Sequence, residues 1–210
     1  MMNITPITDS STLLKYCEIW KKYEYITIDT EFMREKTYWP TLCLIQIGGQ
    51  SECMAIDPMS KQLELSPLYD LMINSKVTKV FHAARQDIEV FYHLTGKIPF
   101  PIFDTQIAAM VCGFGDAVSY QKLASRYAGA KIDKTLRFTD WAQRPLTSDQ
   151  ITYAISDVSH LRTVYESLSA ELDKNERHSW ISQEMEILTS SSTYINNPKD
   201  AWKRIKFYSP

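Results

Sequence analysis

The chain has 210 residues, 44% of them hydrophobic and 23% charged, which is the composition of an ordinary soluble globular protein. This length suits one domain with a substantial core and a short appendage. The net charge of −2 argues against a generally basic coat protein for nucleic acids, but it leaves a nucleic-acid enzyme open because bound Mg²⁺ would reverse the sign of the local field.

The cysteines and the N-terminal segment indicate in which cellular compartment the protein works. Cys17, Cys43, Cys53 and Cys112 are widely spaced and form no CxxC pair, so we expect structural thiols in a reducing compartment rather than a zinc or disulfide framework. Residues 1–6 show no basic start before an apolar stretch, and no apolar run approaches membrane-spanning length. We therefore expect a cytoplasmic protein without a signal peptide or a membrane span.

Strands and helices are expected to alternate in the first half of the chain. Residues 10–22 carry apolar side chains at helical spacing, with Ser10 or Ser11 as the N-cap, and residues 25–32 form an alternating, β-branched strand. The pattern further predicts strands at 41–48 and 53–57, a helix at 68–73, a strand at 78–82, a helix from about 85 to 95, a short strand at 102–103 and a helix to about 112 that is capped by Asp104.

The second half is expected to be mainly helical, with one helix at about 119–128 and a longer one that begins at Thr147. Thr147 and Gln150 have the spacing of a capping box, which marks this helix start clearly. At about 100° per residue, the apolar side chains of the longer helix form one stripe that consists of Ile151, Ala154, Ile155, Val158, Leu161, Tyr165, Leu168 and Leu172.

This order of elements predicts an α/β fold in which helices flank a mixed β-sheet. The segment after about Thr189 is polar, and residues 196–198 have the composition of a linker. We therefore expect one domain over residues 1–190 and a C-terminal linker or tail over residues 191–210.

Two acids interrupt the otherwise apolar strand at 25–32. Asp29 and Glu31 are two residues apart, so both point to the same face of the strand, roughly 7 Å apart. Unpaired charges are costly in a core, which favours a functional site over a packing role. The alternative is an edge strand with a solvated polar face.

Two further acids fall where the fold would bring them to the same cleft. Asp87 follows the predicted strand 78–82, and loops after strand ends line ligand crevices in open α/β folds, although Asp87 could also only stabilise its helix through the dipole. Tyr153 and Asp157 have the four-residue spacing of one helix face and share a flank with His160, or the tyrosine packs at the core edge beside a solvated acid. Clustered acids repel one another unless cations neutralise them, and hard divalent metals prefer carboxylate ligands. The four acids together predict a two-metal site that cleaves phosphodiesters.

Three segments resemble the exonuclease motifs of the DEDD superfamily, in its tyrosine subgroup: Asp29-Thr-Glu31-Phe32, Phe81-His-Ala-Ala-Arg-Gln-Asp87 and Tyr153-Ala-Ile-Ser-Asp157. Further segments are similar to the ribonuclease D family, at 34–46, 103–106, 133–134 and 139–146, and the similarity covers about residues 3 to 205. The resemblance implies an RNase H-like, DnaQ-like exonuclease fold. It also implies 3′→5′ hydrolysis of RNA with two divalent metal ions, Mg²⁺ or Mn²⁺.

The resemblance also implies roles for the catalytic candidates. Asp29, Glu31 and Asp157 would hold one metal, and Asp29 would bridge to a second. Asp87 would act on that second ion through water. Tyr153 would orient the attacking water or help to deprotonate it.

Candidates for substrate contact are spread over several segments. Residues 122–144 hold six basic side chains against two acidic ones, a local excess of +4, and Phe138 and Trp141 lie among them. Such a patch suits phosphate contact and base stacking, although a solvated basic face around a core tryptophan has the same pattern. His82 at a strand end is alternatively a hydrogen-bonded structural histidine, and the resemblance places Lys134 near the scissile bond. The predicted substrate-binding residues are Phe32, His82, Gln86, Lys134, Arg137 and Arg144.

The expected partner is RNA with a single-stranded 3′ end, such as a tRNA precursor. Degradation of very short RNA or DNA oligonucleotides is a variant of this function. A catalytically silent nucleic-acid-binding module is a separate hypothesis, which the four intact acids oppose, and DNA proofreading is a more distant one. Long ribonuclease D proteins carry helical RNA-binding domains after the nuclease, and residues 201–207 resemble the start of the connection to them, so the chain is expected to be a short form or a fragment.

Overall fold

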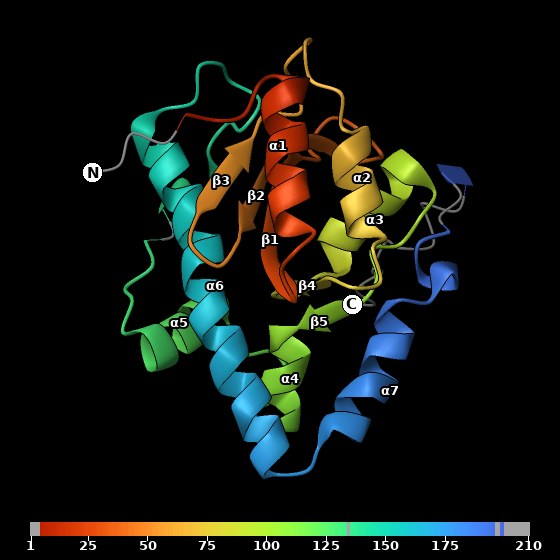
Figure 1. The fold of residues 1–210 in the computed structure, drawn as a ribbon, viewed down its shortest axis with the longest axis vertical. Helices are drawn as coiled ribbons and strands as arrows, with labels where there is room; N and C mark the ends of the chain where they lie inside the picture. The colour runs from red at the N-terminus through yellow and green to blue at the C-terminus, as the bar shows by residue number, and fades with distance from the viewer. Residues whose placement is uncertain (1–4, 134, 196–197, 200–210) are drawn as a thin grey trace, which may run out of the picture.

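A mixed sheet of five strands in the order β3-β2-β1-β4-β5 forms the centre of the computed structural model, which describes residues 5–133, 135–195 and 198–199 (Figure 1). β1 pairs antiparallel with β2 and parallel with β4, so the mixed sheet that the sequence predicts is confirmed. The strands are β1 Tyr25–Met33, β2 Thr41–Gly48, β3 Cys53–Ile56, β4 Thr78–Phe81 and β5 Ile102–Asp104.

Three helices cover one face of this sheet: α1 Ser10–Trp20, α2 Ser66–Met72 and α3 Arg85–Thr95. Their apolar sides join Ile26 and Ile28 of β1 in the largest hydrophobic cluster. The predicted cap of the first helix is wrong, because the side chain of Asp9, one residue earlier, accepts the hydrogen bond from the backbone N of Thr12. Asp9 also accepts a hydrogen bond from the Ser11 hydroxyl, so this serine supports the cap without forming it.

The long helix α6, Ser148–Lys174, packs across β1, β2, β3 and β4 on the opposite face. Its capping box at Thr147 and Gln150 is present as predicted. The predicted stripe is correct at most positions, but Val164 takes the fully buried place that was expected for Tyr165. Tyr165 instead lies at the edge, where its ring contacts Tyr25 and Phe103.

The C-terminal half of α6 leaves the sheet and packs among other helices, as Figure 1 shows for the long teal helix that runs toward the bottom of the view. These partners are α4 Thr105–Val111 and α5 Tyr120–Ala128, and α7 His178–Leu188 contacts α4 in turn. Together they build a second hydrophobic cluster. A short 3₁₀ turn, η1 Thr135–Phe138, lies in the segment between α5 and α6.

The described part of the C-terminal segment still contributes to the core. After the 3₁₀ turn η2 Ser191–Thr193, Tyr194 is buried in the main cluster and its ring faces Tyr92. Residues 196–197 of the predicted linker and the whole segment 201–207 lie outside the described residues. Among the helices of the described ranges, none has the length and apolar character to cross a membrane.

Candidate active site

Helix α6 is fixed to the sheet by a hydrogen bond directly beside the acidic cluster. The Thr27 hydroxyl of β1 donates to the backbone carbonyl of Val158, 2.8 Å away. The opposite residue on β2 is Gly48, where a Cβ atom would lie 2.3 Å from Thr27 Oγ1 and 3.1 Å from the Val158 carbonyl oxygen. A glycine is therefore required for α6 to approach this closely, and the contact brings the neighbouring Asp157 to β1.

Asp29, Glu31 and Asp157 form a compact carboxylate cluster. One carboxylate oxygen from each side chain lies within 4.8 Å of the others. Asp29 and Glu31 are half-buried, whereas Asp157 is only 9% exposed. Its Oδ1 atom is buried and has no hydrogen-bond partner within the described residues. Such a set of converging oxygens has the donor chemistry of a hard divalent cation site.

Asp87 lies in the same cleft but outside this cluster. It stands in the first turn of α3, is buried, and accepts a hydrogen bond from the hydroxyl of Thr30 on β1. Its carboxylate is therefore held by the protein itself, in contrast to the orphaned oxygen of Asp157. The four predicted acids do meet at one cleft, with three close together and the fourth set apart.

Burial and mutual repulsion favour the protonated form of these acids. Desolvation raises the pKa of Asp29 to about 6 and, together with the charge of Asp29, the pKa of Asp157 to about 8. The pKa of Glu31 rises to about 10, because desolvation adds to the charges of the other three acids. The pKa of Asp87 also lies well above its ordinary value, for the same two reasons. A cation that replaced the protons would remove this repulsion.

Two tyrosines flank Asp157. Tyr153, one helical turn earlier, is half-buried against Trp141 and lines the cleft. Desolvation and the neighbouring carboxylates hold its pKa above the ordinary value, so the phenol keeps its proton at neutral pH. Tyr120 is a residue that the sequence does not single out: its hydroxyl donates to the backbone carbonyls of Asp157 and Ser156 and so ties α5 to the acidic segment of α6.

The cleft has a volume of about 530 Å³ and contains the acids, Tyr153 and most of the predicted substrate contacts. Its walls include Phe32, His82, Gln86 and Arg137, together with the tip of η1, where Phe138 is 88% exposed. His82 is also tethered, because its Nδ1 atom lies 3.0 Å from Thr105 Oγ1. His82 therefore has the hydrogen bond of a structural histidine and also lines the cleft, where its contact with substrate stays a prediction.

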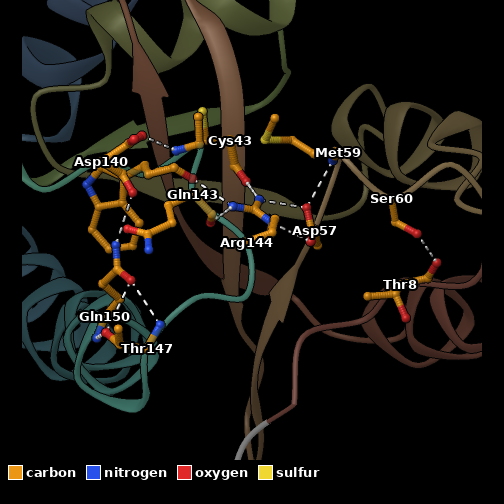
Figure 2. A network of polar contacts seen from close by, with 12 residues as sticks. Thr8, Cys43, Asp57, Met59, Ser60, Asp140, Gln143, Arg144, Thr147 and Gln150 are labelled. Atoms are coloured by element: carbon orange, nitrogen blue, oxygen red, sulfur yellow. Dashed lines mark hydrogen bonds and ion pairs between the residues drawn. The ribbon is translucent and has the colours of Figure 1, made fainter.

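One predicted substrate contact lies away from the cleft, and another falls outside the described residues. Lys134 lies outside the described residues. Arg144 lies elsewhere and forms two 2.7 Å hydrogen bonds to the Asp57 carboxylate and one to the Cys43 carbonyl (Figure 2). Its guanidinium thereby ties the segment before α6 to β2 and the end of β3. The side chain of Arg144 thus binds the protein itself, and the substrate contact predicted for it is not supported. Trp141 beside it is buried, which favours the alternative of a core tryptophan.

Comparisons with known proteins show the family of the chain. The sequence model of the 3′-5′ exonuclease family matches residues 4–173. A protein named ribonuclease D from Zymomonas mobilis is 51% identical over 207 residues, which are 98% of this chain and 53% of that protein. The chain spans about half the length of the curated relatives it matches.

Solved structures have the same fold. The crystal structure of Escherichia coli RNase D, described as an exoribonuclease involved in structured RNA processing, superposes with a TM-score of 0.89 at 33% identity, over 97% of this chain and 54% of that one. Brucella melitensis NrnC bound to pGG superposes with a TM-score of 0.75 at 25% identity, over 90% of this chain and 92% of that one. The predicted α/β fold and the resemblance drawn from the motifs are both confirmed.

Proposed function

The chain belongs to the 3′-5′ exonuclease family, and on this basis we propose that it removes nucleotides one at a time from single-stranded 3′ ends of RNA with divalent cations. The observation that carries the proposal is the cluster of Asp29, Glu31 and Asp157, whose oxygens lie within 4.8 Å of one another beside Tyr153. Carboxylates at this spacing, in a cleft large enough for a nucleotide, suit metal-assisted phosphodiester hydrolysis.

The donor set fits the two cations that the motifs imply, Mg²⁺ or Mn²⁺. Asp29, Glu31 and Asp157 would hold one ion, and the buried, unpartnered Oδ1 of Asp157 is a ready ligand atom. Asp29 would also serve a second ion, on which Asp87 would act through water; both residues line the cleft. Cations bound there supply Lewis-acid stabilisation of the charge that develops on the scissile phosphate, and they acidify water.

The other cleft residues position the substrate. Tyr153, protonated at neutral pH, would donate a hydrogen bond that orients the attacking water. Arg137 would supply a positive charge for a phosphate, since it lines the same cleft as the acids and its charge lowers the pKa of Asp157. Phe32 and the exposed Phe138 offer aromatic faces for the terminal bases.

The substrate we propose first is the 3′ end of a structured RNA such as a tRNA precursor. The likeness to Escherichia coli RNase D supports it, because that enzyme is described as acting in structured RNA processing. Very short oligonucleotides are the second candidate, which the likeness to NrnC bound to pGG favours because this likeness covers 92% of that chain. The four free cysteines suit work in the reducing cytoplasm.

The test is digestion of 5′-labelled substrates with Mn²⁺ or Mg²⁺. A tRNA precursor, a short oligoribonucleotide and the matching oligodeoxynucleotide are digested side by side. We expect RNA to shorten stepwise from its 3′ end, EDTA to stop the reaction, and Asp157→Asn to abolish it. Internal cleavage, shortening from the 5′ end, or RNA binding without any cleavage would each contradict the proposal, the last in favour of a silent binding module.

A further inference from the structure

One buried side chain next to the acidic cluster has no hydrogen-bond partner among the residues that the structure describes. Gln46 of β2 is fully buried, and within the described ranges neither its Nε2 donor nor its Oε1 acceptor forms a hydrogen bond. Buried amides are almost always paired, because burial removes them from water without replacing the lost hydrogen bonds. An unpaired amide inside the sheet therefore needs an explanation.

The position of Gln46 places its side chain beside the cluster. Its neighbours in sequence, Ile45 and Ile47, belong to the core under α1, α2 and α3, so Gln46 points to the opposite face, under α6. On that face it stands directly opposite Asp29, and side chains opposed in this way have Cβ atoms about 5 Å apart. Its partner on the other side is Ala55, which offers no polar side chain.

We propose that the Gln46 amide is a positioning residue for Asp29: its Nε2–H donates to the Asp29 carboxylate when a cation is bound, and so sets the affinity of the site for divalent cations. Asp29 is the side chain directly across from Gln46 that carries a hydrogen-bond acceptor, and a cation leaves some lone pairs of its carboxylate free. A neutral donor is the right group here, since another carboxylate would add to the repulsion among the acids. Outer partners of this kind fix the orientation of metal-ligating carboxylates.

The proposal rests on the proposed function, because it assumes the cation site. It also predicts how Gln46 affects the stability of the cation-free protein. If the amide has no partner until a cation binds, its removal does not destabilise the cation-free fold. A residue that only supports the core would lower that stability when it is replaced.

The experiment compares Gln46→Met, which keeps the length of the side chain and removes its hydrogen bonds, with the parent. Gln183→Met, at an exposed position of α7, is the matched control. Mn²⁺ affinity is measured by titration calorimetry without RNA, and thermal unfolding is measured in EDTA. We expect Gln46→Met to unfold at the same or a higher temperature, to bind Mn²⁺ about 10- to 100-fold more weakly, and to regain activity at high Mn²⁺ with an unchanged KM for RNA. The control should match the parent throughout.

Mn²⁺ affinity within about twofold of the parent, or a loss of cation-free stability that accounts for the lost activity, would overturn this inference alone. A parent that binds no Mn²⁺ would overturn the proposed function as well. A second measurement needs no variant: the side-chain amide protons of Gln46 should shift downfield in NMR spectra as Mg²⁺ is added to the parent. An unchanged resonance at saturating Mg²⁺ would refute the hydrogen bond to Asp29.

Discussion

Arg137 and Arg144 belong to the same basic segment, yet the structure gives their guanidinium groups different surroundings. Arg137 lines the cleft, whereas Arg144 is bound by Asp57 and by the Cys43 carbonyl. We expect Arg144→Ala to lower the free energy of unfolding by about 1–3 kcal/mol, because it leaves a largely buried carboxylate without its charged partner. Arg137→Ala should instead leave stability unchanged and reduce the salt dependence of RNA binding by about one phosphate contact.

Urea unfolding and RNA binding at several salt concentrations check both variants. If Arg144→Ala had the unfolding midpoint of the parent and bound RNA more weakly, Arg144 would be a substrate contact after all. An Arg137→Ala variant with parental RNA affinity would remove Arg137 from them.

The two kinds of catalytic candidate should differ in how much activity depends on them. Tyr153→Phe removes one hydrogen-bond donor beside Asp157, and we expect kcat to fall by about 10²- to 10⁴-fold. Asp29→Ala removes the acid that both cations would share, so we expect no measurable turnover. Single-turnover release of nucleotide from labelled RNA measures both losses. If Tyr153→Phe were as active as the parent, the role given to this tyrosine would be wrong.

The raised pKa values of the acids predict a pH dependence of the cation-free protein. Desolvation lifts the pKa of Asp29 to about 6, of Asp157 to about 8 and of Glu31 to about 10, above an ordinary carboxyl value near 4. Between the ordinary carboxyl pKa near 4 and the raised pKa values of the folded state, the folded chain holds more protons than the unfolded chain. The free energy of unfolding therefore decreases as pH rises through this range. The contribution of these carboxyl groups to the free energy of unfolding is fully present below about pH 4, and it is lost as pH rises to the pKa of each group in the folded state.

We therefore expect the unfolding temperature in EDTA to fall by at least about 5 °C between about pH 5 and about pH 8, since a loss of even about 2 kcal/mol lowers it by about 4–8 °C for a chain of this size. Glu31→Gln should flatten this dependence, and Mn²⁺ should restore stability at the upper end. Calorimetric scans across this range measure it. A melting temperature that rises with pH in EDTA, by an amount that Glu31→Gln reduces, would contradict the desolvation described above.

At the scale of elements, the contact between β1, β2 and α6 decides where Asp157 lies. Gly48→Ala would place a Cβ atom 2.3 Å from Thr27 Oγ1 and 3.1 Å from the Val158 carbonyl, so α6 must move outward. We expect this variant to lose about 1–3 kcal/mol of stability through overpacking and to bind Mn²⁺ more weakly. Thr27→Val is the companion variant, because it removes the hydrogen bond to Val158 with little change in shape.

Calorimetry of unfolding and of Mn²⁺ binding gives both quantities. If Gly48→Ala bound Mn²⁺ like the parent, the close approach of α6 would have no bearing on the cluster. Ser125→Ala, at an exposed position of α5, serves as a control for a change of similar size.

The elements that the sequence predicts well are those whose ends depend on neighbouring residues. The capping box of Thr147 and Gln150 spans one turn, so its chemistry is complete in the local sequence. The end of α3 at Gly96 follows equally directly, because this residue adopts a φ of +68°, a conformation that suits glycine. The alternation in β1 predicted which side chains share a face, and therefore that Asp29 and Glu31 point together.

What the sequence could not supply depends on contacts between distant segments. Arg144 lies in a basic patch, and only the fold shows that it forms an ion pair with Asp57, which is far away in the chain. The orphaned amide of Gln46 and the hydroxyl bond of Tyr120 are equally invisible, since nothing in a strand or helix pattern distinguishes these side chains. Helix α7 buries only Ile181 fully in the described structure, so its apolar period is too weak to predict.

At the scale of the whole molecule, the chain combines a candidate catalytic cleft with C-terminal residues whose described part packs onto the core. Tyr194 is buried against the same cluster that supports β1 and α3. The curated relatives continue beyond the part that this chain matches, since it spans about half of their length. We expect the residues described here to carry the chemistry, and selection among RNAs to involve whatever those longer proteins add.

Four acids and one arginine are the charged residues that line the described cleft, apart from His82. An anionic ligand thus enters a cleft lined mainly by carboxyl groups, and we expect bound Mn²⁺ to strengthen its binding. Thermodynamic reciprocity then requires a nucleoside 5′-monophosphate, the expected product, to tighten Mn²⁺ binding by the same factor, about 5- to 150-fold for typical coupling. Two calorimetric titrations, each ligand with and without the other, should yield equal factors above one. A factor of one would mean that the nucleotide binds away from the acids, and the cation site would then have no part in holding the product.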